Sequence, residues 1–204
     1  MRIKLILSGL FCLAIIYFIN AKLKTDKDNK IARQIIYIQP LGEVNPHIMS
    51  LINSEIKHFY NKKLVMLPSV PLTKDLLAKS KTRYDASKIL KKFKSDKNIL
   101  IITEKDIAVK YERRHSEEWG IFGLGACPGN TCVVSTFRLK RKATEKLFRE
   151  RIVKVCIHEL GHNLGLPHCK ADDKCLMNDA NGTISQVDKE CMYFCDSCKK
   201  KIRN

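Results

Sequence analysis

Residues 158–168 read His-Glu-Leu-Gly-His-Asn-Leu-Gly-Leu-Pro-His, and this short stretch constrains the fold and the chemistry of the whole chain. His158 and His162 are four residues apart, so on a helix both imidazoles project from one face and can reach the same metal ion. Gly165 can adopt the left-handed conformation that ends a helix. The chain can then turn back and bring the imidazole of His168 to that ion. Three protein ligands leave one tetrahedral position open, which is typical of a catalytic zinc site.

Glu159 directly follows the first histidine, about 100° further round the helix. From there its carboxylate can contact a metal-bound water without ligating the metal, which is the position of a general base. A purely structural metal site needs no base. Glu159 therefore favours an enzyme over the alternative, a non-catalytic zinc-stabilised protein that binds a partner through its basic surface.

The residues before the motif predict the helix that it requires. Over residues 143–164, Phe148, Ile152, Cys156 and Leu160 recur at four-residue intervals and form one apolar face. We expect one long helix that ends within the motif.

Upstream of this helix, short apolar runs alternate with segments of helical period. The run Ile-Leu-Ile-Ile at 99–102 is continuously apolar, as in a strand buried on both faces. Residues 119–130 contain four glycines and a proline, which predicts a loop. The alternation predicts an α/β (α+β) fold with a mixed, mostly parallel sheet. The expected strands are 35–38, 64–67, 98–103 and 131–137, and the expected helices are 46–60, 85–93 and 143–164.

Downstream residues complete a family pattern. The extended His-Glu motif followed by a methionine resembles the metzincin zinc peptidases, and the cysteines narrow the resemblance to the archaemetzincins. A cysteine follows the third histidine, a Cys-x-Met provides the methionine turn, and a Cys-x-x-Cys closes the domain; these are Cys169, Cys175-Leu176-Met177 and Cys195-Asp196-Ser197-Cys198. Arg83-Tyr84-Asp85-Ala86 is also similar to a stretch of that family. The likeness covers about residues 35–200.

Six of the nine cysteines lie between Cys156 and Cys198, close to the histidines of the motif. Four of them could form a tetrahedral structural zinc site: Cys169, Cys175, Cys195 and Cys198. Cys191 is close enough to compete as a ligand, and in an exported protein some thiols could form disulfides instead. Cys127 and Cys132 flank Pro-Gly-Asn-Thr and could pair in an oxidising compartment.

The resemblance implies a zinc-dependent peptidase with a Cys-rich, zinc-bound C-terminal segment. His158, His162 and His168 would hold a catalytic zinc ion, the four cysteines a structural one, and Met177 would lie beneath the imidazoles. Glu159 would act as general base on a zinc-activated water. The substrate would be a peptide or protein cut by endo- or aminopeptidase action, and it would lie along an edge strand, for which 131–137 is the candidate.

The N-terminus has the pattern of a targeting segment. Residues 1–24 place an apolar run, Leu5 to Ile19, between cationic residues, which predicts a signal peptide or membrane anchor. We expect residues 25–34 to be a linker and 35–204 to be the peptidase domain. The protein would then be membrane-anchored or exported, with a cytoplasmic location as the alternative.

Net charge suggests solvated surface rather than nucleic-acid binding. The 38 Lys and Arg residues against 21 Asp and Glu give a formal charge of +17, and only 10 of those cations are Arg. Arg is the side chain that best recognises phosphates and guanine edges. We therefore expect no nucleic-acid binding. We also expect the protein to be a monomer.

Overall fold

The computed structural model describes residues 35–112 and 115–202. The predicted signal or anchor (1–24) and linker (25–34) lie outside these residues. Within the described part of the chain, no helix has the length and apolar character needed to cross a membrane.

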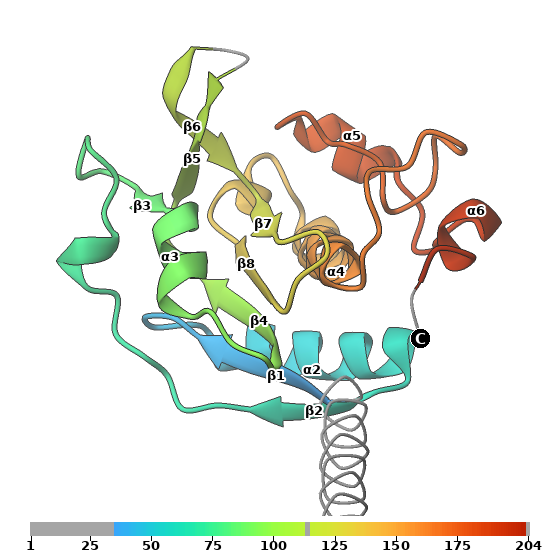
Figure 1. Ribbon diagram of the computed structural model, residues 1–204, viewed down its shortest axis with the longest axis horizontal. Coiled ribbons are helices and arrows are strands. Elements are labelled where there is room, and N and C mark those ends of the chain that lie inside the picture. Colours follow the sequence, from blue (N-terminus) through green and yellow to red (C-terminus); the bar gives the residue numbers. More distant parts are fainter. Residues whose placement is uncertain (1–34, 113–114, 203–204) are drawn as a thin grey trace, which may run out of the picture. The chain divides into compact units, whose positions relative to one another are not determined.

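A five-stranded sheet lies at the centre, in the order β2-β1-β4-β8-β7 (Figure 1). Its first four strands are parallel neighbours, and the last pairs antiparallel at one edge. The predicted mostly parallel sheet is confirmed. The strands are β1 (Ile35–Pro40), β2 (Lys63–Met66), β4 (Asn98–Thr103), β7 (Gly123–Gly125) and β8 (Thr131–Ser135).

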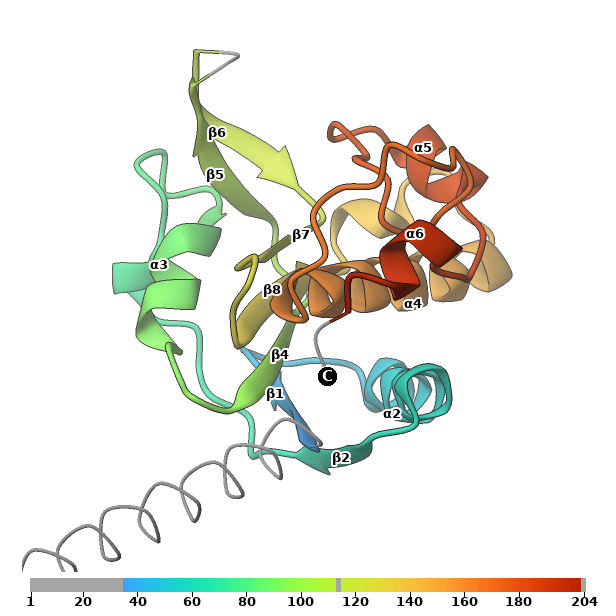
Figure 2. The ribbon, with the colours of Figure 1, turned by 45° about the vertical axis from the view of Figure 1, so that its right-hand side comes forward.

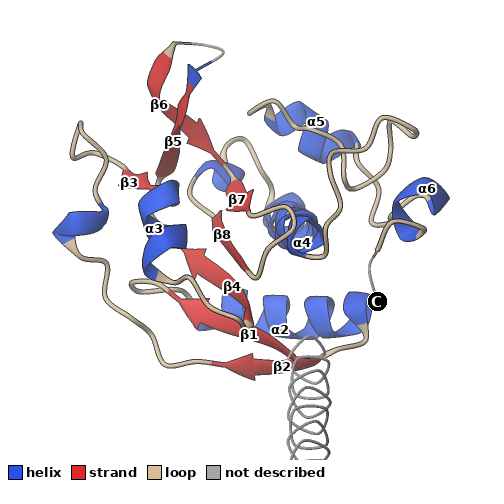
Figure 3. Ribbon diagram, in the orientation of Figure 1, coloured by secondary structure: helices blue, strands red, loops and turns tan. Residues whose placement is uncertain are grey.

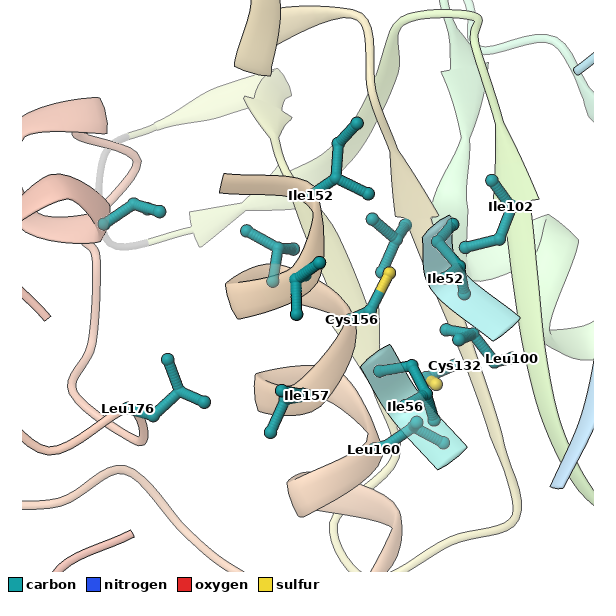
Figure 4. Close-up of a cluster of buried hydrophobic side chains, with 14 of the residues drawn as sticks. Ile52, Ile56, Leu100, Ile102, Cys132, Ile152, Cys156, Ile157, Leu160 and Leu176 are labelled. Carbon is teal, nitrogen blue, oxygen red and sulfur yellow. The ribbon is translucent and has the colours of Figure 1, made fainter. Parts of the chain in front are cut away.

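Helices cover both faces of this sheet. α2 (Pro46–Tyr60) and α4 (Glu145–Asn163) pack against one face, and α3 (Ala86–Lys92) packs against the other. The central strand β4 is buried along its whole length, as its apolar run predicts. Figure 4 shows the larger core cluster, in which Leu100 and Ile102 of β4 meet side chains from both helices, among them Ile52, Ile56, Ile152 and Cys156.

A second, three-stranded sheet has the strand order β3-β5-β6. Its strands are β3 (Tyr84–Asp85), β5 (Ile107–Tyr111) and β6 (Ser116–Ile121). The prediction of a loop over 119–130 is therefore wrong at two places, since β6 continues to Ile121 and β7 occupies 123–125. Short strands rich in glycine lack the β-branched and aromatic composition by which strands are recognised in sequence.

The long helix has the limits expected of its sequence. Thr144 accepts a hydrogen bond from the Leu147 N–H at the N-terminus, and Gly165, at φ 89°, follows its last turn. The Thr144 side chain satisfies a backbone N–H that has no partner within the helix, and the left-handed conformation of Gly165 ends the helix. The motif is thus held at the C-terminal end of a well-defined helix.

The described chain after Gly165, residues 166–202, packs along α4 and contains two short helices, α5 (Ile184–Lys189) and α6 (Asp196–Lys199) (Figures 2 and 3). Buried Arg151 of α4 forms a bidentate pair with Asp188, at 2.7 and 2.8 Å. Lys154 Nζ donates to the Val187 carbonyl at 3.0 Å. These polar contacts explain why α4 is buried on more than the single apolar face that its period predicts.

Candidate active site and metal centres

The three histidines of the motif meet in space. His158 and His162 lie on the last turns of α4, and His168 approaches from the segment beyond Gly165. One nitrogen from each ring lies within 4.8 Å of the others. The three rings are therefore grouped as the sequence predicts, close enough for one metal ion to contact all of them.

The second nitrogen of each ring is already engaged. Nδ1 of His158 contacts the Leu176 carbonyl at 2.8 Å, and Nδ1 of His162 contacts the Leu166 carbonyl at 2.7 Å. Nδ1 of His168 lies 3.5 Å from Oδ2 of Asp179. A carbonyl partner requires a proton on Nδ1, so Nε2 is the nitrogen left for a metal ion. The donor set and its orientation fit a zinc ion with three imidazole ligands.

Burial favours the neutral form of two of these imidazoles, those of His158 and His162. It lowers the pKa of His158 to about 3, helped by the neighbouring His162. Burial also lowers the pKa of His162. Neutral imidazole is the form that binds metal, so no proton has to be displaced from these two rings at neutral pH.

Glu159 is buried beside the histidines, with 7% of its surface exposed. Burial raises its pKa to about 8, although a hydrogen bond from the Gly125 backbone N–H opposes the shift. A carboxyl group in such surroundings takes up a proton readily.

The glycines of β7 bring this strand against Glu159. A Cβ at Gly123 would lie 2.6 Å from both Cγ and Oε1 of Glu159, and one at Gly125 would lie 2.8 Å from the Glu159 carbonyl oxygen. Larger residues at these positions would therefore push the edge strand away from α4. The sequence prediction that 131–137 is the edge strand is wrong, because β8 lies between β4 and β7. The edge strand next to the motif is β7.

Replacement of Gly123 by Ala should lower peptidase turnover by at least about tenfold, since misplacement of a reacting group by about 1 Å can cost up to a hundredfold. The added methyl group would displace the Glu159 side chain. Steady-state kinetics of the zinc-loaded variant would measure the loss, with zinc content as the control for intact metal sites. Unchanged turnover would show that the close packing of β7 against Glu159 has no catalytic consequence.

Met177 packs against the same helix. It is fully buried, and its Sδ would lie 2.5 Å from a Cβ at Gly161. Gly161 therefore gives the methionine room directly beside His162. The backbone around Met177 also makes hydrogen bonds near the site. The Met177 carbonyl accepts from the Cys169 N–H at 2.7 Å, and the Leu176 carbonyl orients His158.

Four cysteines form a second cluster, as predicted. The sulfur atoms of Cys169, Cys175, Cys195 and Cys198 all lie within 4.8 Å of one another. Cys169 Sγ is 3.6 Å from Cys195 Sγ, and Cys175 Sγ is 3.8 Å from Cys198 Sγ. Zn–S bonds of about 2.3 Å in a tetrahedron place the sulfurs about 3.8 Å apart, so these distances fit a structural zinc site.

The remaining described cysteines lie elsewhere and are free thiols. Cys191 is exposed and outside the cluster, so it does not compete as a ligand. Cys127 is exposed, whereas Cys132 is buried in β8, and the two do not form the disulfide that their spacing allowed. Cys156 belongs to the core of α4 (Figure 4).

A cavity of about 520 Å³ opens beside the histidines and Glu159. Residues from several elements line it, including Trp119 of β6, Leu124 of β7 and Val187 of α5. Its walls are largely apolar, and His158, Glu159 and His162 border it. A substrate side chain can therefore enter next to the reactive groups.

Two features of the site escaped the sequence analysis. Asp179 lies two residues after Met177, and its carboxylate contacts the ring of His168, as carboxylates commonly do beside metal-bound histidines. Gly123 and Gly125 are two residues apart, so both lie on one face of a strand. This period of two is the feature of the sequence that could have indicated a strand here.

The fold and the site together define a zinc metallopeptidase of the metzincin class. The defining features are a mixed sheet, a helix ending in His-Glu-x-x-His, a third histidine beyond a glycine, and a buried methionine against that helix. The model of peptidase family M54 matches residues 29–204, and the chain belongs to this family, the archaemetzincins.

Relatives and solved structures agree with this assignment. The archaemetzincin of Archaeoglobus fulgidus is 34% identical over 168 residues, which cover 82% of this chain and 98% of that protein. The archaemetzincin of Halobacterium salinarum is 29% identical over 177 residues, covering 81% and 97%. The crystal structure of the A. fulgidus protein superposes with a TM-score of 0.72, over 82% of this chain and 99% of that one. That of Methanopyrus kandleri archaemetzincin, 24% identical, has the same fold, with a TM-score of 0.68 over 84% and 94%.

Proposed function

We propose that this protein hydrolyses peptide bonds with a zinc-activated water and Glu159 as general base. The observation that carries the proposal is the position of Glu159. Its carboxylate is buried next to three histidines grouped for one metal ion, and it borders the cavity beside them. A site that only stabilised the fold would need no buried carboxylate at the open side of the metal. This disfavours the alternative of a non-catalytic binding protein.

Each residue has a separate task. Nε2 of His158, His162 and His168 would hold the catalytic zinc ion, and Cys169, Cys175, Cys195 and Cys198 the structural one. When bound, zinc lowers the pKa of a ligated water to about 7 and polarises the scissile carbonyl. Glu159 would accept the water proton on its carboxylate and deliver it to the leaving amine.

The edge strand β7 would bind the substrate backbone. It is paired on one side only, with β8, and its glycines place it directly against Glu159. An extended peptide can add to such an edge through main-chain hydrogen bonds. The scissile carbonyl would then lie near the metal centre, and a neighbouring side chain would enter the cavity.

Digestion of a peptide library tests the proposal. The zinc-loaded protein should cleave peptides, and a chelator should abolish the cleavage. The new termini, identified by mass spectrometry, would distinguish endopeptidase from aminopeptidase action. Absence of cleavage from a broad library, with zinc bound, would contradict the proposal.

Replacement of His162 by Ala should remove one of two zinc ions. Metal analysis of the wild-type protein should find about two zinc per chain, and the variant should retain only the ion held by the four cysteines. The exposed His47, far along the chain, provides a matched histidine control whose replacement should leave both ions in place. A variant that keeps two zinc ions would mean that the imidazole cluster is not a metal site.

A further inference from the structure

Cationic side chains gather at the edge of the five-stranded sheet where its parallel strands begin. Lys63 is the first residue of β2 and pairs in register with Ile35, the first residue of β1. Lys97 comes directly before Asn98, the first residue of β4, which pairs with Ile36 on the other side of β1. Neighbouring strands lie about 4.8 Å apart. The two lysines therefore flank the start of β1 on both sides.

Further lysines surround this edge. They lie in three short segments of the chain: 57–63, 94–97 and 199–202. The last segment is near the end of α2, because the Phe194 ring lies 5.2 Å from that of Phe59, and Figures 1 and 2 show the end of the described chain close by. Together the segments contain eight lysines, no arginine and one acidic residue, Asp96. We call these three segments the lysine face.

Most of the charge on the lysine face is not neutralised by acidic side chains. Lys57, Lys63 and Lys94 are exposed, and none of them has an acidic partner among the described residues. Lys199 has an acidic neighbour on its own helix, Asp196, at 3.6 Å. The face therefore presents an excess of positive charge to its surroundings.

The opposite edge of the sheet, where the parallel strands end, has a different charge pattern. There Lys140 pairs with Glu104 at 3.1 Å, and Arg138 pairs with Asp106 at 2.6 Å. Acidic side chains thus offset part of the positive charge at that edge. A surface of opposite charge is attracted most strongly where such partners are missing, which is at the lysine face.

The chain reaches the lysine face from the part of the sequence that is predicted to enter a membrane. Ile35 follows the predicted linker, 25–34, which follows the predicted signal or anchor, 1–24. A linker of ten residues spans at most about 35 Å when it is fully extended. An anchor in a bilayer would therefore hold the lysine face within that distance of the lipid headgroups.

We propose that the lysine face binds the surface of a bilayer that contains anionic phospholipids. The ammonium group of lysine is a compact charge that attracts phosphate headgroups without the planar geometry that arginine requires. Clusters of such cations next to a membrane segment are attracted to anionic lipids. None of the eight lysines lines the cavity beside the histidines, so the face and the candidate active site use different residues. The proposal goes beyond the peptidase function and does not depend on it.

Labelling of lysines in vesicles tests the proposal on the wild-type full chain. The zinc-loaded protein is reconstituted in phosphatidylcholine vesicles with or without phosphatidylglycerol, and an impermeant reagent then acetylates its accessible amines. Mass spectrometry gives the labelling rate of each lysine. In the anionic vesicles Lys57, Lys63 and Lys97 should react at least about fivefold more slowly than in the neutral ones, the scale of one lysine's attraction to an anionic surface.

The internal controls for labelling are exposed lysines that follow the ends of β4 and β8, Lys105 and Lys142. Their rates should differ little between the two kinds of vesicle. Equal slowing of these lysines and the lysine face, or no slowing at the lysine face, would overturn the proposal.

Substitution measures the same interaction as a binding ratio. The triple variant Lys57→Gln, Lys63→Gln, Lys97→Gln should lower the ratio of binding to anionic over neutral vesicles by about a hundredfold, since each lysine near an anionic surface contributes about fivefold. The ratio cancels any binding that apolar residues contribute equally in both lipids. The matched control replaces three other exposed lysines by glutamine: Lys105, Lys142 and Lys146.

The control variant should keep the wild-type ratio, and an equal fall in both variants would overturn the proposal. If the triple variant does not fold, the labelling of the wild-type chain decides alone. Nucleic acid is the competing partner for a cationic surface, so a DNA duplex is titrated into the same proteins. Loss of duplex binding in the triple variant, with an unchanged vesicle ratio, would overturn the membrane proposal and assign the face to nucleic acid.

Discussion

Glu159→Gln should retain both zinc ions and the wild-type melting temperature, yet lose at least about a hundredfold in turnover on any peptide that the wild type cleaves. Glutamine preserves the size of the side chain but cannot accept the water proton. The carboxylate is not among the groups that would ligate zinc, so metal content should not change. Steady-state kinetics with zinc analysis of the same samples would measure both quantities.

Glu150→Gln is the matched control for this experiment. Glu150 lies on the same helix but is exposed, so its replacement should leave turnover unchanged. Equal activity of the wild-type protein and Glu159→Gln would show that the cleavage does not depend on this carboxylate. Loss of zinc from Glu159→Gln would assign Glu159 to the metal site itself rather than to proton transfer.

Cys195→Ser should lower the melting temperature by at least about 10 °C. A structural zinc site contributes about 10 kcal/mol or more to folding, and in a chain of this size each kcal/mol shifts the melting temperature by about 2–4 °C. The segment that the four cysteines hold together has only two short helices. We therefore expect it to depend on the metal for its order, and calorimetry of the zinc-loaded proteins would measure the change.

The catalytic zinc should be weakened in the same variant. His168 is adjacent to Cys169, and the carbonyl that orients His158 belongs to Leu176, adjacent to Cys175. The comparison is with Cys191→Ser, because Cys191 is exposed and outside the cluster. A melting temperature equal in the two serine variants, or detection of the four thiols as two disulfides, would contradict the structural zinc site.

The parts of the site that the sequence predicts are those fixed by local periodicity. The four-residue spacing of His158 and His162 and the apolar period before them determine one helix with both imidazoles on one face. Gly165 then determines where the helix ends, and its φ of 89° confirms the expected conformation. The four-cysteine cluster follows a family pattern of spacing, and it is found as predicted.

The parts that the sequence does not predict depend on contacts between distant segments. A side chain at either glycine of β7 would meet Glu159, which lies 36 positions after Gly123 and 34 after Gly125 along the chain. The same long-range packing makes β7 rather than β8 the edge strand. Composition alone therefore predicts a loop where the structure has the strand that lies against Glu159.

Three imidazoles should hold a zinc ion with an open position, apart from a second zinc ion held by four thiolates. Anomalous diffraction at the zinc edge from crystals of the zinc-loaded protein tests it most directly. We expect two peaks, one about 2.0–2.1 Å from Nε2 of His158, His162 and His168, and one about 2.3 Å from the sulfurs of Cys169, Cys175, Cys195 and Cys198. A single peak at the cysteines, with the imidazoles metal-free at saturating zinc, would contradict the account.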